Sequence, residues 1–200
     1  MDFITNFPLS WGYSNIMVVI DRLSKFAHFI PSKPGFNSKI VVEVLIQNIA
    51  KLYGFPESIV SDRDRVFISS FWRHLFNSQG TQLAMSSSYH PQSDGQTTEN
   101  LNKILEMYLR CYIFDHLKNW IEMLPWAQYW YNFAFHHSMG MSPYQVVYGK
   151  PPPSLIRYKY SEYDPSAIQD SLKMRDALLN KLKVKLQQSQ NYMKSKWEEN

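Results

Sequence analysis

Three carboxylates occupy positions from which a folded chain could bring them together. Asp2 lies in a short apolar run at the start of the sequence, and Asp62 closes a second such run, ESIVSD. Glu99 follows a polar, turn-forming stretch, YHPQSDGQTT. Neighbouring carboxylates repel each other and raise each other's pKa, and a divalent cation removes that penalty. Two cations about 3.5–4 Å apart can hold the attacking and leaving oxygens of a phosphoryl displacement, so these acids are candidate ligands for such a pair.

Each acid also has a structural interpretation that needs no metal. Asp2 could be a surface acid at a strand end, and Asp62 could form a salt bridge in a turn. Glu99 could stabilise the first turn of a helix through the helix dipole. The residues after Glu99 favour the metal site, because Asn102 and Lys103 follow it by three and four positions and share its helix face. A carboxylate, an amide and an ammonium group on one face suit a metal ion and the phosphate that it binds.

The elements that would position these acids follow from the apolar pattern. Apolar runs separated by turn residues predict an antiparallel meander of strands at 2–5, 15–21 and 26–31. Two more short, buried strands are predicted at 57–62 and 81–86. Apolar residues at helical spacing predict helices at 41–54, 69–80, 97–114, 118–136 and 141–149. This order predicts an α/β fold with a mixed five-stranded sheet flanked by helices.

Each predicted helix has an apolar side that we expect to face the core. In helix 41–54 these residues are Val41, Val44, Leu45, Ile49 and Leu52. In helix 69–80 they are Phe71, Leu75 and Phe76, and in helix 97–114 they are Leu101, Leu105, Tyr108, Leu109 and Tyr112. Ser142-Pro143 predicts a helix start, and Pro125 predicts a kink or restart within helix 118–136.

The chain is predicted to contain two parts. The KPPP run at 150–153 ends the first, 1–153, and the second, 154–200, holds a linker and a long amphipathic helix over 166–197. Leucines recur there at three- and four-residue steps, with lysines between them. The lysine-rich side is either a solvated face or a face that meets DNA or another copy of the chain.

Composition narrows the class of protein. The 200 residues carry a formal net charge of +4 and have a pI near 9.0, which permits a polyanionic partner without establishing one. The single cysteine, Cys111, cannot form an internal disulfide or a cysteine-based zinc site, and it indicates a reducing compartment. No apolar run approaches the roughly 18–20 residues that span a bilayer, so we expect no membrane segment.

Six distinctive segments follow one another along the chain. They are MDFITNFPLSWGY, VVIDRLSKFAHFIP, SDRDRVFISSFW, YHPQSDGQT, WAQYWYNFAFHHSMGMSP and GMSPYQVVYGKPP. Together they resemble the integrase of gypsy-class LTR retrotransposons, and the resemblance covers essentially the whole chain. Residues 1–153 resemble the catalytic core, and the tail resembles the helical segment that follows it. The resemblance implies an RNase H-like fold.

The resemblance also implies DNA integration by a metal-dependent polynucleotidyl transferase. In that family an Asp, Asp, Glu triad binds two Mg²⁺ or Mn²⁺ ions, and Asp2, Asp62 and Glu99 match it, with Asp2 bridging both ions. Water first trims the DNA ends of the element to a free 3′-hydroxyl, which then attacks a target phosphodiester in line. The implied partners are double-stranded DNA and further copies of the chain. The substrate implies a nuclear location.

Five further residues resemble positions of the family that contact DNA. They are Tyr89, Gln92 and Ser93 in the polar stretch, and Asn102 and Lys103 on the helix that follows. Three other acids do not match the triad. We interpret Asp21 and Asp64 as structural and Asp94 as a loop or cap residue.

The chain departs from the family pattern at one place. The family reads DGQTE, with 35 residues between the second and third acids, whereas this chain reads DGQTTE, with 36. If the loop absorbs the extra threonine, Glu99 remains the third acid and the downstream segment ENLNKILEMYLRC keeps its register. If the extra residue lies inside the helix, it rotates Glu99 by about 100° and puts Thr98 at the metal position. We favour absorption by the loop.

Two other functions remain open. The chain could be a catalytically inactive remnant that binds DNA or itself, or a hydrolase of the ribonuclease H type, although the later motifs fit the hydrolase poorly. The family's N-terminal zinc-binding module and its C-terminal DNA- or chromatin-binding module have no counterpart in these residues. We therefore expect a core fragment that holds no zinc.

Overall fold

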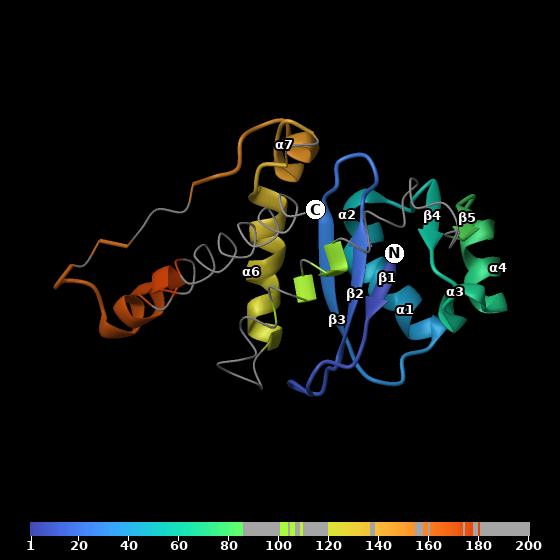
Figure 1. Cartoon of the computed structure of the whole chain (residues 1–200), viewed down its shortest axis with the longest axis horizontal. Helices are drawn as coiled ribbons and strands as arrows, with labels where there is room; N and C mark the ends of the chain where they lie inside the picture. The colour runs from blue at the N-terminus through green and yellow to red at the C-terminus, as the bar shows by residue number, and fades with distance from the viewer. Residues whose placement is uncertain are drawn as a thin grey trace, which may run out of the picture. The chain divides into compact units, whose positions relative to one another are not determined.

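The structure is a computed structural model that describes residues 1–85, 101–103, 105, 106, 109, 120–136, 139–154, 158, 159, 161–173, 175–177 and 180. The chain divides into two compact units, Met1–Pro152 and Pro153–Asn200. Every strand among the described residues belongs to the first unit, which contains the candidate site (Figure 1). Over the same residues, no helix has the length and apolar character needed to cross a membrane.

Three antiparallel strands form the first sheet, in the order β1–β2–β3 (Figure 1). β1 spans Asp2–Ile4, β2 spans Asn15–Ile20, and β3 spans Ala27–Ser32. Trp11 and Gly12, at φ 51° and 83°, make the tight turn between β1 and β2. Because both residues of such a turn have positive φ, the glycine favours it. The predicted meander is confirmed.

The other two strands form a separate sheet. β4 (Ser58–Ser61) and β5 (Gln82–Met85) pair in parallel. The single five-stranded sheet that the sequence predicted is therefore not confirmed. The Met1 amino group donates a hydrogen bond to the Val60 carbonyl oxygen, 2.7 Å away, so the start of β1 lies beside β4. β1 has only three residues, so it has few backbone groups with which to pair with β4. The five strands therefore form two separate sheets, which meet where β1 lies beside β4.

β1 directs successive side chains to opposite faces of its sheet. Phe3, Met17 and Ile30 are register partners in one row across the three strands. The Phe3 ring stacks on Phe36, with 4.3 Å between the ring centroids. Asp2 precedes Phe3 and therefore points to the opposite face. The alternation of side chains along β1 therefore places Phe3 in the core and Asp2 on the face that carries the candidate site.

A continuous helical segment covers the core side of the sheet. It consists of α1 (Ser38–Leu45), a π-helical turn η1 (Ile46–Ala50) and α2 (Lys51–Tyr53). Val41, Leu45 and Ile49 are buried as predicted and pack in one cluster with Met17. Leu52, expected on the same face, is instead 58% exposed. The π turn adds a residue to one helical turn and rotates the following residues off the predicted face.

Two short helices follow β4. They are α3 (Arg65–Ile68) and α4 (Ser70–Ser78). In α4 the buried side chains are Trp72 and Phe76, whose ring centroids lie 4.4 Å apart. Phe71, which the sequence predicted to be buried, is exposed. Phe76 is buried as predicted, and Leu75 is partly buried against the same core cluster. The Ser69 hydroxyl accepts the Trp72 N–H and caps α4 at the predicted start of the helix.

The next helical residues carry part of the candidate site. Residues 101–103, 105, 106 and 109 are helical and are drawn in green in Figure 1. Leu101, Leu105 and Leu109 are buried, which confirms the predicted phase of this helix. The side chains of Tyr108 and Tyr112, predicted on the same face, lie outside the described residues.

Two more helices complete the first unit. α6 (Trp120–Phe133) continues through Pro125 without a restart, and α7 spans Pro143–Tyr148. Ser142 caps α7 in a capping box with Gln145, which confirms the predicted start of this helix.

α6 lies along the outer edge of β3 (Figure 1). Two of its side-chain amides bond to the backbone of that strand. Asn132 accepts the Ala27 N–H and donates to the Ala27 carbonyl oxygen, both at 2.8 Å. Gln128 accepts the Phe29 N–H, also at 2.8 Å. An edge strand otherwise presents unpaired backbone groups, so these two amides take the place of a neighbouring strand.

Because His28 is partly buried, we expect the stability of the fold to depend on pH. Burial lowers its pKa, and its Nε2 is buried without a hydrogen-bond partner among the described residues. His28 therefore binds a proton more readily in the unfolded chain than in the folded chain. The free energy of unfolding keeps its full value above the unfolded pKa of about 6.5 and decreases as the pH falls below that value. We expect His28→Phe to remove part of this fall, at most about 1.4 kcal/mol per pH unit for one proton.

Urea unfolding at pH 7 and pH 5 measures this difference. Burial also lowers the pKa of His136, so this residue still contributes to the loss of stability at low pH in the His28→Phe variant. His74→Gln, at an exposed position on α4, is the matched control. An equal loss of stability on acidification in wild type and His28→Phe would contradict the assignment.

The second unit contains the start of the predicted amphipathic helix. Residues 166–173, 175–177 and 180 are helical. The Tyr158 N–H donates to Asp176 at 2.7 Å, and the Tyr158 hydroxyl donates to Asp164 at 2.9 Å. The remainder of the predicted helix, 181–197, lies outside the described residues.

Candidate metal site

Asp2 is oriented by hydrogen bonds to both of its carboxylate oxygens. The Phe3 N–H donates to Oδ1 at 2.8 Å, and Asn102 Nδ2 donates to Oδ2. The first bond comes from the next residue, whereas the second joins residues 100 positions apart. The neighbouring Leu101 is buried, so the packing of the helix brings the Asn102 amide to β1.

Asp62 follows β4 directly and lies near Asp2. It is exposed, and its Oδ1 accepts the Asp64 N–H at 3.2 Å in the turn that leads to α3. Its negative charge acts on Asp2. The bond between Met1 and Val60 joins the two strands at this point. The structure thus brings together the first two acids of the predicted triad, as well as Asn102.

The electrostatics of the pair are those of two neighbouring carboxylates. Burial raises the pKa of Asp2, and the charge of Asp62 raises it further. The hydrogen bonds from Phe3 and Asn102 and the charge of the Met1 amino group oppose this shift without outweighing it. Burial lowers the pKa of that amino group, although Asp2 and Asp62 favour its charged form. A divalent cation would relieve the repulsion between the carboxylates, and oxygen ligands of this kind fit Mg²⁺ or Mn²⁺.

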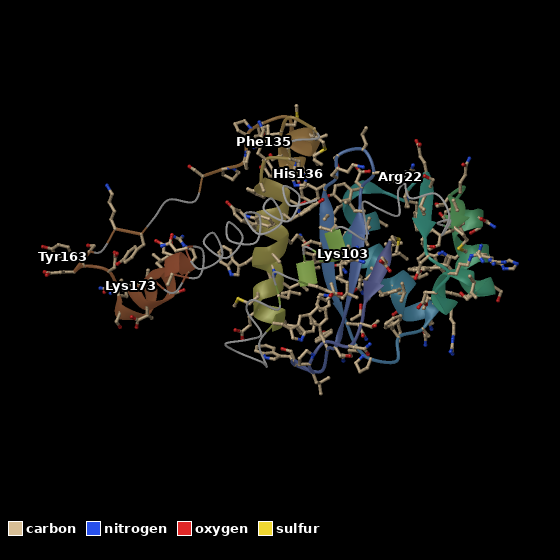
Figure 2. All side chains as sticks on the ribbon, viewed as in Figure 1. Arg22, Lys103, Phe135, His136, Tyr163 and Lys173 are labelled. Atoms are coloured by element: carbon tan, nitrogen blue, oxygen red, sulfur yellow. The ribbon has the colours of Figure 1, made fainter. Side chains whose placement is uncertain are left out.

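The rest of the predicted site is described in part. Glu99, Tyr89, Gln92 and Ser93 lie outside the described residues, as does Asp94. Lys103 is described, and it is exposed beside Asn102 (Figure 2). Within the described ranges, no three Asp, Glu, His or Cys side chains come together as a metal site. The structure therefore places the Asp62 charge where it acts on Asp2, and the metal site with its third acid stays a prediction.

The contact between Asn102 and Asp2 is the feature that sequence reasoning missed. The sequence placed Asn102 on the face of Glu99 but assigned it to DNA. Its spacing of three residues from a candidate ligand was the available signal, because an amide one helical turn away reaches the same site.

The two acids interpreted as structural, Asp64 and Asp21, do have structural roles. Asp64 accepts the Val66 N–H at 2.8 Å and caps α3. Asp21 accepts hydrogen bonds from the backbone and hydroxyl groups of Ser24. These observations agree with the roles expected from the sequence.

The chain is similar to part of two retrotransposon proteins of Schizosaccharomyces pombe (strain 972). The Transposon Tf2-3 and Tf2-4 polyproteins are each 34% identical to it over 148 residues, which is 74% of this chain. The chain spans 11% of the length of each polyprotein. No family model matches the chain.

The fold is similar to that of solved retroviral integrases. A chain of the simian T-cell lymphotropic virus intasome in complex with PP2A regulatory subunit B56 gamma matches with a TM-score of 0.61 and 21% identity, over 82% of this chain and 60% of that one. The HTLV-2 integrase catalytic core domain in complex with magnesium, in its trimeric form, matches with a TM-score of 0.56 and 17% identity, over 72% of this chain and 93% of that one. The chain is thus a homologue of a segment of retrotransposon polyproteins, and it has the fold of a retroviral integrase catalytic core.

Proposed function

We propose that the chain is the catalytic core of a retrotransposon integrase, which joins DNA by metal-dependent polynucleotidyl transfer. The proposed steps are processing of the 3′ ends of the element and transfer of those ends into target DNA. The contact between Asn102 and Asp2 carries the proposal, because it brings the helix that follows Glu99 to the two acids Asp2 and Asp62 on an integrase fold.

Glu99 is the proposed third acid. Leu101, Leu105 and Leu109 fix the phase of the helix, and Asn102 points to Asp2. A helix that continues one turn towards the N-terminus places residue 99 on the Asn102 side, three positions earlier. The segment ENLNKILEMYLRC, which begins at Glu99, resembles the integrase family in this register and supports the same assignment.

Asp2, Asp62 and Glu99 would hold two Mg²⁺ or Mn²⁺ ions. Such ions, when bound, stabilise negative charge on the attacking and leaving oxygens of the phosphodiester. The magnesium complex of the HTLV-2 integrase core supports the choice of metal. The chain's own part is to hold the carboxylates in place, with Asp2 oriented by the Phe3 N–H and the Asn102 amide.

Double-stranded DNA is the proposed substrate. The net charge of +4 and the exposed Lys103, which follows Asn102 in the same helix, suit a polyanion. Tyr89, Gln92 and Ser93 remain proposed contacts near the scissile phosphate. A multimer and action in the nucleus are also proposed, the first supported by the intasome and the trimeric form among the structural neighbours.

A strand-transfer assay tests the proposal. The 200-residue chain is incubated with duplex oligonucleotides from the element's ends, with labelled target DNA, and with Mg²⁺ or Mn²⁺. We expect joined products that disappear when EDTA removes the metal. A chain that binds this DNA but joins none of it at any metal concentration would contradict the proposal and favour the inactive DNA-binding remnant.

The doubled threonine has its own test in the same assay. If Thr98 is the extra residue of a loop, Thr98→Ala keeps strand transfer within about threefold of wild type, because surface substitutions change free energies by about 0.5 kcal/mol. If Thr98 stands at the metal position, the wild type is inactive and Thr98→Glu gains activity. That gain would contradict the assignment of Glu99.

A further inference from the structure

The orientation of the Asp2 carboxylate depends on one tertiary contact. The Phe3 N–H that binds Oδ1 belongs to the next residue, so this bond depends on local backbone geometry. The bond from Asn102 to Oδ2 crosses from a helix to β1 and forms only when the helix docks. Rotation of the carboxylate about its own bond is therefore restrained by Asn102.

An amide is well suited to hold a carboxylate that must also bind a cation. A hydrogen bond to a charged acceptor is stronger than one between two neutral groups. Unlike lysine or arginine, Asn102 donates without bringing a positive charge, so Asp2 keeps its full negative charge for the cation. Each carboxylate oxygen has two acceptor sites, and the bonds from Phe3 and Asn102 occupy one on each oxygen.

The amide oxygen of Asn102 also supports a role at the metal site. Its Oδ1 is buried and has no hydrogen-bond partner within the described part of the chain. A buried acceptor without a donor is unfavourable, and a water molecule bound to a cation is one donor that would satisfy it. Exchanging the two ends of the amide would turn Oδ1 towards the Asp2 carboxylate, which repels it. The orientation in the structure is therefore the one that places a donor against Asp2.

We infer that Asn102 is a positioning residue, which fixes the Asp2 carboxylate for the divalent cation through its side-chain amide rather than serving as a contact for DNA. This inference rests on the proposed metal site at Asp2 and Asp62. Residues that hydrogen-bond to metal ligands typically change metal affinity or activity about 10- to 100-fold when they are replaced. We expect a loss of that size on replacement of Asn102.

Calorimetric titration of the 200-residue chain with Mn²⁺ alone, without DNA, tests the inference. Asn102→Leu keeps a similar shape and removes the hydrogen bond, and Asn102→Ala is the second variant should the leucine disturb folding. Both are expected to bind Mn²⁺ about 10- to 100-fold more weakly than wild type. Asn77→Ala, the same chemical change at an exposed position on α4, is expected to leave the affinity unchanged.

A second measurement separates positioning from DNA contact. Binding of duplex DNA in EDTA is expected to be equal in wild type and Asn102→Leu, because the residue acts through the metal site. Weaker DNA binding in EDTA together with wild-type Mn²⁺ affinity would overturn the inference and make Asn102 a DNA contact. A wild-type chain that binds no Mn²⁺ would overturn the proposed metal site itself, and the inference with it.

Discussion

Replacing Asp62 with asparagine is expected to lower the rate of strand transfer about a thousandfold, since metal ions supply several kcal/mol of charge stabilisation and each 1.36 kcal/mol is a factor of ten. Asparagine keeps the shape of the side chain and the oxygen that accepts the Asp64 N–H. The loss would therefore come from the missing charge at the metal site. Single-turnover strand transfer at saturating Mg²⁺, with DNA binding measured separately in EDTA, checks this expectation.

Asp64→Asn provides the matched control for Asp62→Asn. Asp64 lies two positions away and caps α3, and asparagine is an equally good N-cap. We expect this variant to transfer strands within about threefold of wild type, since nothing at the metal site changes. Equal effects of the two substitutions, or an Asp62→Asn variant with wild-type activity, would remove Asp62 from the site.

Replacing Asn132 with leucine is expected to destabilise the fold by about 2–6 kcal/mol, because two buried backbone groups lose their partner at roughly 1–3 kcal/mol each. Those groups are the N–H and the carbonyl oxygen of Ala27, which is fully buried on β3. Leucine has a similar volume but can satisfy neither. Urea unfolding followed by circular dichroism measures the change in the free energy of unfolding.

Gln128→Leu gives a graded comparison for Asn132→Leu. Gln128 accepts only the Phe29 N–H and is partly buried, so its loss is expected to cost about 1–2 kcal/mol. The order of the two effects follows from the number of backbone groups left without a partner. An Asn132→Leu variant as stable as wild type would show that α6 does not hold the edge of β3 through this amide.

Most local features of the fold could be predicted because they depend on neighbouring residues. The short apolar run at Phe3 and Ile4 predicted the strand β1, and Ser142-Pro143 predicted the start of α7. Leu101 and Leu105 at four-residue spacing fixed the buried face of their helix. Predictions that depended on the phase of a helix were wrong where a turn changed that phase. Leu52 follows a π turn and is exposed, whereas Phe76 in α4 is buried as predicted.

The strands beside Asp2 and Asp62 and the buried face of the helix that carries Asn102 could be predicted from the sequence, because apolar period and turn chemistry are local. Only the tertiary structure decided that Asn102 meets Asp2 and that Asn132 satisfies Ala27. It also decided that the strands divide into sheets of three and two. Hydrogen bonds between residues about a hundred positions apart leave no periodic pattern in the sequence, since they depend on how helices dock onto strands.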